Sequence, residues 1–279
     1  MLMLSALIVL SMTASAQLPD EARAALNRGE AALQAALATY ERQYPDRPLW
    51  QEAFAAGREA EALAPEALEP VRFLAEAYSR ANWYGPAFGA WQRYLAAGGE
   101  LDPKAAPLFA GVGTELGYTA YSRNDLQTAL DYYLSVIDEV NYNTEAYVWA
   151  GRILLETGRP AEAIPYWQTV LERDATDERA DYFLALAQDQ AEWGVEANEA
   201  FRAGVRLYEE NQTLRARERF ARATVANPDY AEAWAWLGRT AFEMGDYPNA
   251  ATYYREAASL EPSNQTYRYF LEESQCRAG

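Results

Sequence analysis

The most restrictive feature of the sequence is a pattern of apolar and small residues that recurs with a period of 34 residues. The pattern is clearest in residues 231–264, where eight positions carry the repeated residue classes. These residues are Trp234, Leu237, Gly238, Ala241, Ala250, Tyr254, Ala257 and Pro262. Repetition at this period indicates short structural units that stack on one another, because one unit alone cannot bury its apolar face.

Within one period the residues predict two helices that pack together. Trp234, Leu237 and Ala241 are spaced by three and four, which places them on one face of a helix. Gly238 lacks a side chain, so a second helix can cross close to the first at that point. Pro262 ends the second helix, because the residue before a proline avoids helical geometry. The period therefore predicts a helix–turn–helix unit.

The same pattern extends over most of the chain. It defines units at 197–230, 144–177, 110–143 and 68–101, with a degenerate helical unit at 17–67. Residues 102–109, which contain Pro103 and Pro107, interrupt the spacing and predict a widened turn between units. Residues 178–196 supply only half a unit, one helix, and predict a bend or a subdomain boundary. Residues 265–279 predict a capping helix and tail.

The repeat closely resembles the tetratricopeptide repeat, whose period and residue classes it shares. The resemblance implies an all-α solenoid of antiparallel helix pairs with a C-terminal capping helix. In this family the first helix of each unit lines a concave groove, and positions 2, 5, 9 and 12 commonly face a protein or peptide ligand. Carried over, the protein-binding residues are Arg72, Glu76, Tyr118, Tyr121, Glu145, Arg152, Phe201, Tyr208 and Arg239.

We hypothesise that the groove binds an extended segment or a helix of another protein, with Tyr118, Tyr121 and Arg152 central. Aromatic residues and arginine are enriched at protein interfaces because they bring large contact area and directional hydrogen bonds. The alternative is that these side chains coat a solvated face or pack locally. The family's carboxylate-gripping set of Lys, Asn and Arg is absent, since the only lysine is Lys104 in the insertion.

Composition restricts the chemistry that the chain can perform. There is no histidine, so the usual general base and the commonest metal ligand are both missing. The single cysteine, Cys276, cannot form an internal disulfide. The net charge of −17 disfavours nucleic acid and anionic membranes, and indicates either solubility or attraction to a basic partner. No catalytic residue, cofactor or metal is predicted, and the chain is predicted not to be an enzyme.

The N-terminus predicts export. Residues 1–12 are almost wholly apolar, and Ala14 and Ala16 place small residues where a signal peptidase reads. The apolar run is short for a membrane span, so a signal peptide at 1–16 is favoured over an anchor. The predicted mature chain starts at Gln17, without stable membrane insertion, in a periplasm, cell envelope or secreted location.

One basic cluster stands out in this acidic chain. Arg215, Arg219 and Arg222 share a helical face, which indicates either a surface paired with nearby glutamates or a dock for phosphate, an acidic partner or anionic lipid. The pairing with glutamates is favoured. The function predicted overall is an exported scaffold or adaptor for protein–protein interactions. The alternatives are an accessory subunit of one envelope enzyme or transport machine, and a carboxylate-based hydrolase.

Overall fold

The protein is all-α, as the repeat predicts. The computed structural model describes residues 18–279, which form fourteen helices and no strand. The predicted signal peptide at 1–16 and the predicted mature start at Gln17 lie outside the described residues.

The helices gather into two compact units that are described separately, Met1–Ala146 and Tyr147–Gly279. The bend predicted at residues 178–196 does not coincide with this division and stays a prediction. The first unit contains α1 (Asp20–Thr39), α2 (Pro48–Leu63), α3 (Leu68–Arg80), α4 (Tyr84–Ala96), α5 (Ala105–Ser122) and α6 (Leu126–Glu139). The second contains most of α7 (Thr144–Glu156), then α8 (Pro160–Arg173), α9 (Glu178–Trp193), α10 (Val195–Glu209), α11 (Thr213–Ala226), α12 (Ala231–Glu243), α13 (Tyr247–Leu260) and α14 (Gln265–Ala278).

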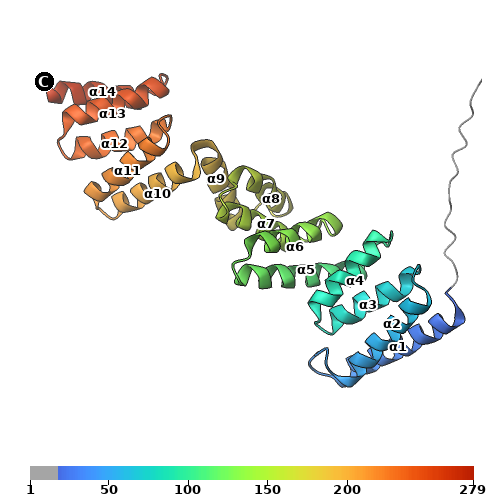
Figure 1. The fold of residues 1–279 in the computed structure, drawn as a ribbon. Coiled ribbons are helices and arrows are strands. Elements are labelled where there is room, and N and C mark those ends of the chain that lie inside the picture. Colours follow the sequence, from blue (N-terminus) through green and yellow to red (C-terminus); the bar gives the residue numbers. More distant parts are fainter. Residues whose placement is uncertain (1–17) are drawn as a thin grey trace, which may run out of the picture. The chain divides into compact units, whose positions relative to one another are not determined.

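Within each unit, consecutive helices run back and forth and pack side by side (Figure 1). The contact between the two helices of one repeat is closest where a glycine faces a ring. A Cβ atom added to the glycine at repeat position 8 would lie 2.6–2.9 Å from an aromatic ring at position 24. The pairs are Gly117 with Tyr133, Gly151 with Trp167, Gly204 with Phe220 and Gly238 with Tyr254. The close crossing predicted at Gly238 is therefore confirmed, and it recurs along the chain.

The turn between the two helices of a repeat also has a fixed conformation. The residue at position 15 has a positive φ in all five full repeats, and it is always asparagine or glycine. These residues are Asn82, Asn124, Gly158, Asn211 and Gly245. Left-handed backbone is tolerated best by glycine and next by asparagine, so this position selects those two residues.

The turn at the insertion is widened, as predicted: eight residues separate the end of α4 at Ala96 from the start of α5 at Ala105, against four between α6 and α7. Helix α5 already begins at Ala105, so it has 18 residues and absorbs most of the insertion. The Oδ1 of Asp102 accepts hydrogen bonds from the backbone N–H groups of Lys104 and Ala105, both at 2.9 Å. Pro107 falls in the first turn, where a helix does not need its N–H group.

The half-repeat is a single helix, as predicted. α9 packs against α8 and ends at Gly194, whose φ of 85° lets α10 start at the next residue. The end of α9 is fixed to the following repeat: the Nδ2 of Asn227 donates to the carbonyl oxygen of Trp193 at 2.9 Å. The Trp193 ring also stacks on Tyr230, with centroids 4.6 Å apart. No second helix follows α9 before α10 begins.

Candidate protein-binding surface

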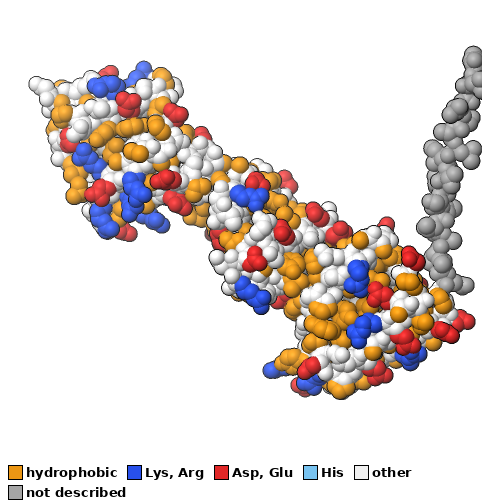
Figure 2. All heavy atoms as spheres, in the orientation of Figure 1, with side chains coloured by type: hydrophobic (Ala, Val, Ile, Leu, Met, Phe, Trp, Pro, Cys, Tyr) orange, Lys and Arg blue, Asp and Glu red, His pale blue; other side chains and the backbone are white. Residues whose placement is uncertain are grey.

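An open cleft lined mainly by aromatic side chains lies on the C-terminal unit between α12, α13 and α14. Its volume is about 540 Å³. We call it the aromatic cleft. It is lined by Glu232, Ala235, Trp236, Arg239, Phe242, Glu243, Tyr254, Thr266, Tyr267 and Phe270. Figure 2 shows hydrophobic side chains gathered over this part of the unit.

An arginine that lies over two adjoining rings forms one wall of the aromatic cleft. The Arg239 guanidinium lies 4.9 Å from the ring centroids of both Tyr208 and Trp236, and these rings meet edge to face at 5.1 Å. The Nε of Arg239 donates to Glu243 at 3.1 Å, and the Tyr208 hydroxyl donates to the same carboxylate oxygen at 2.6 Å. Because a guanidinium has five N–H donors, this arrangement holds Arg239 in place and leaves donors for a ligand.

The tyrosines of this surface stay neutral at physiological pH. Burial raises the pKa of Tyr267 to about 12, helped by the carboxylates of Glu261 and Glu232. Burial is also the main cause that raises the pKa of Tyr208, followed by its hydrogen bond to Glu243. Neutral tyrosines beside an arginine offer apolar area together with hydrogen-bond donors, which suits a peptide or protein ligand.

The structure brings together two of the residues predicted to bind protein in this unit and separates a third from them. Tyr208 and Arg239 touch each other through the ring stack at the aromatic cleft. Phe201 lies in the core, where its ring packs on Phe220 and Tyr230, and only 9% of it is exposed. Phe201 therefore offers almost no surface to a ligand.

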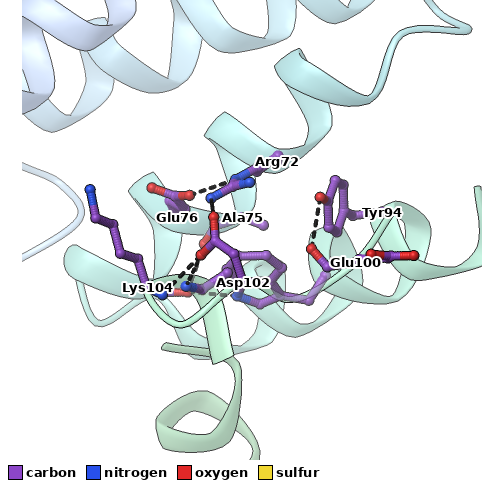
Figure 3. Close-up of polar contacts among 10 residues, drawn as sticks. Arg72, Ala75, Glu76, Tyr94, Glu100, Asp102 and Lys104 are labelled. Carbon is purple, nitrogen blue, oxygen red and sulfur yellow. Dashed lines mark hydrogen bonds and ion pairs between the residues drawn. The ribbon is translucent and has the colours of Figure 1, made fainter. Parts of the chain in front are cut away.

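In the N-terminal unit, Arg72 and Glu76 are engaged with their own chain. Arg72 donates to Glu76 at 2.9 Å and to Asp102 at 2.6 Å, which ties α3 to the start of α5 (Figure 3). The hydrogen bond from Arg72 is the largest cause that lowers the pKa of Asp102, to about 2. These contacts give Arg72 and Glu76 a role in the fold. A role in binding for this pair stays a prediction.

The three remaining predicted residues of the N-terminal unit each act on the charge of one buried tyrosine. Burial raises the pKa of Tyr133, and the charges of Glu145, Glu115, Tyr118 and Tyr121 raise it further. Tyr118 is 54% exposed on α5. A contact of Tyr118, Tyr121 or Glu145 with a ligand stays a prediction.

Arg152, on α7 of the C-terminal unit, is held by its own helix. It pairs with Glu156 at 2.8 Å and stacks over Trp149, 5.2 Å from the ring centroid. The arrangement resembles the one around Arg239, with an aromatic ring and a glutamate four residues on. Its role in binding also stays a prediction.

The residues that sequence reasoning missed come from two places. Trp236 is at position 6 of its repeat, which was not among the positions carried over. Tyr267 and Phe270 lie on the predicted capping helix and pack against Tyr254 and its neighbours. Both are only half-buried and also line the aromatic cleft.

Residues 18–279 contain no group of three or more Cys, Asp or Glu side chains placed to hold a metal ion. No helix among them is both long and apolar enough to cross a membrane.

Comparisons with known proteins agree with the helix pairs described above. Residues 120–187 and residues 201–265 each match a family model described as tetratricopeptide repeat. No curated protein sequence matches the chain.

Solved structures with a similar fold are distant in sequence. YrrB, described as a TPR protein with an unusual peptide-binding site, is 20% identical, with 78% of this chain and 98% of that chain covered and a TM-score of 0.32. A tetratricopeptide repeat protein from Parabacteroides merdae is 12% identical, with 89% and 99% covered and a TM-score of 0.38. PilF of Pseudomonas aeruginosa is 18% identical, with 90% and 99% covered and a TM-score of 0.31.

Proposed function

The chain belongs to the tetratricopeptide-repeat family, and on that premise we propose that it is an exported adaptor that binds a segment of another protein in its aromatic cleft. The fold suggests a scaffold for protein–protein interaction, and the choice of the cleft rests on one observation. Arg239 lies over the adjoining rings of Tyr208 and Trp236 at the rim of an open apolar hollow. Rigid aromatic side chains with a fixed arginine are the residues that dominate binding energy at interfaces.

Binding would use the aromatic cleft in two ways. The rings of Trp236, Phe242 and Phe270 remove an apolar side chain of the ligand from water. The donors of Arg239 that are not used within the protein meet a carbonyl or carboxylate of the ligand. The proposed ligand is therefore a peptide segment that pairs an apolar or aromatic side chain with a nearby acceptor.

A random-peptide library displayed on phage tests the binding proposal. Selection on the purified protein is expected to enrich one family of peptides, and Trp236→Ala is expected to weaken their binding by about tenfold or more. Tyr142→Ala is the matched control, because Tyr142 is an aromatic residue that is 62% exposed outside the aromatic cleft. Equal affinity for Trp236→Ala and the unchanged protein, or no enriched peptide family, would reject the proposal.

Export and the absence of catalysis are separate parts of the proposal. Export rests on the apolar run at 1–12 and on Ala14 and Ala16. Intact mass spectrometry of the protein from its native cells is expected to find a chain starting at Gln17, and a chain that retains residues 1–16 would overturn export. The absence of catalysis rests on a sequence without histidine and on a family known mainly for binding.

A further inference from the structure

A second cleft, lined by arginines, lies where the repeat pattern is interrupted. It has a volume of about 520 Å³, and its walls come from α9, α10 and α11. We call it the arginine cleft. Its polar lining consists of Gln190, Glu196, Asn198, Glu199, Arg202, Arg206, Arg219 and Arg222. Figure 2 shows basic side chains gathered over the region of α10 and α11. None of these residues lines the aromatic cleft.

The arginine cleft exists because one helix is missing. In the C-terminal unit, α11 packs against α12 and α13 packs against α14, so a second helix covers the first helix that follows it. The helix before α10 is α9, which is itself a first helix and packs against α8. The face of α10 that a second helix would cover is therefore left open.

The residues on this face differ from those on α12. At repeat positions 3, 6 and 10, α12 has Ala233, Trp236 and Thr240, of which the first and last are fully buried. The same positions in α10 are Glu199, Arg202 and Arg206. Charged side chains thus replace core side chains where the covering helix is absent.

Two arginines of the arginine cleft have no partner within the described part of the chain. Arg202 donates to the Tyr182 hydroxyl at 2.7 Å, and Arg222 lies 4.0 Å from Glu196. In contrast, the side chains of Arg206 and Arg219 make no ion pair, hydrogen bond or ring contact there. With four arginines against two glutamates, this spot is positive in a chain whose net charge is −17.

Two buried amide side chains in the wall of the arginine cleft also lack partners. Gln190 is 8% exposed and its Oε1 accepts no hydrogen bond, while Asn198 is 1% exposed and neither its Oδ1 nor its Nδ2 is bonded. The Tyr230 hydroxyl lies near Asn198 but outside hydrogen-bond geometry. A buried polar group without a partner destabilises the fold, so its presence in a cleft points to a ligand.

From this combination we infer that the arginine cleft binds an acidic segment of a partner protein. Carboxylates of the segment pair with Arg206 and Arg219. Backbone N–H and C=O groups of the segment satisfy the acceptors of Gln190 and Asn198 and the Asn198 donor. A bare oxyanion fits less well, because it has no N–H donor for the two amide oxygens and would face them with like partial charge.

Fluorescence anisotropy with a labelled peptide of alternating glutamate and glycine tests this inference. A peptide with glutamine in place of glutamate is the matched control, since it keeps the shape and removes the charge. The glutamate peptide is expected to bind about tenfold more tightly, with an affinity that falls as salt rises. Equal binding of the two peptides would overturn the inference.

Variants of the protein locate the site. Arg206→Gln combined with Arg219→Gln is expected to weaken binding of the glutamate peptide by about tenfold or more. Arg255→Gln is the control, because Arg255 is an exposed arginine on α13 outside both clefts. Trp236→Ala is expected to leave this binding unchanged, so failure of this inference is distinguishable from failure of the aromatic cleft.

Two further measurements separate a binding role from a structural one. Gln190→Leu is expected to raise the thermal unfolding midpoint while it weakens the glutamate peptide, whereas a purely structural Gln190 would lower the midpoint. Inorganic phosphate is expected to compete poorly. If phosphate displaces the peptide at the same concentration as free peptide does, the site is a simple anion site and the inference is wrong. If the chain self-associates through these arginines, the cleft joins copies of the chain and the inference is also wrong.

Discussion

Helices α10 and α12 hold the same place in consecutive repeats, yet the faces they turn toward the preceding helix differ. α12 is covered by α11 and has Ala233, Leu237 and Thr240 buried there. α10 follows the half-repeat and presents charged residues instead. The pairing within each repeat is the same in both, with a glycine facing a ring. The absence of one helix therefore leaves one face of α10 uncovered without changing how the repeat itself packs.

The largest difference in stability between the two helices is expected when a charge is placed at repeat position 7 of α12 and of α10. Leu237 is 3% exposed, so Leu237→Arg buries a charge without a partner and should lower the free energy of unfolding by about 4 kcal/mol or more. Ala203 is the half-exposed equivalent in α10, and Ala203→Arg should change it by about 0.5 kcal/mol or less. Chemical denaturation followed by circular dichroism measures both. Equal destabilisation would mean that the α10 face is covered after all.

A smaller effect, the same in both repeats, is expected at the position 8 glycines. Gly204→Ala and Gly238→Ala each force a Cβ atom against a ring and should lower the free energy of unfolding by about 2 kcal/mol. Gly111→Ala is the control, because nothing lies within 4 Å of its added Cβ atom and alanine favours the helix. A large difference between the first two variants would show that the missing helix also disturbs packing inside the repeat.

The uncovered face of α10 is expected to lower the free energy of unfolding through the buried side chain of Gln190. Gln190→Leu removes a buried acceptor that has no partner and should raise the free energy of unfolding by about 1 kcal/mol. Gln188→Leu, at an exposed position on the same helix, should leave it unchanged. Thermal unfolding of the two variants side by side measures the difference. A destabilised Gln190→Leu protein would mean that water or another group already satisfies this side chain.

The smallest effect is expected in the pH dependence of stability, where Arg72, which pairs with Asp102, differs from Arg206, which has no ion pair in the described part of the chain. Arg72 holds the pKa of Asp102 at about 2, below its unfolded value, so this carboxylate stabilises the fold above about pH 4. The contribution is lost as pH falls toward 2. The unfolding midpoint of Asp102→Asn should fall less over this range than that of the unchanged protein. Arg206→Gln should leave the pH profile unaltered, and parallel profiles for Asp102→Asn and the unchanged protein would contradict the assignment.

The parts of the fold that the sequence predicts are those set by local sterics. The glycine at position 8, the aromatic residue at position 24 and the proline after the second helix each act within one repeat. The turn at position 15 is also set by local sterics, because its positive φ is adopted by Gly158 and Gly245 and by Asn82, Asn124 and Asn211. The early start of α5 could not be predicted from the repeat, because it depends on the hydrogen bonds that the Asp102 carboxylate accepts from the backbone N–H groups of Lys104 and Ala105.

The candidate sites depend on what covers each helix, which a repeat pattern alone does not specify. Tyr208 and Arg239 were predicted as single ligand contacts, and their joint stacking with Trp236 came only from packing. Phe201 is at a family ligand position but lies in the core. Arg206 was overlooked, although a comparison of Arg206 with Thr240 at the same repeat position would have found it. The predicted half-repeat marks the place in the chain where this cleft lies.

The glycine and the ring that it accommodates belong to the same stretch of 34 residues. A break in the chain placed between repeats therefore never separates the glycine from its ring. A break between repeat positions 8 and 24 does separate them. A repeat moved as a whole thus keeps its internal packing. Its outer face must still match the helix that covers it, because α12 buries Ala233 and Thr240 where α10 carries Glu199 and Arg206.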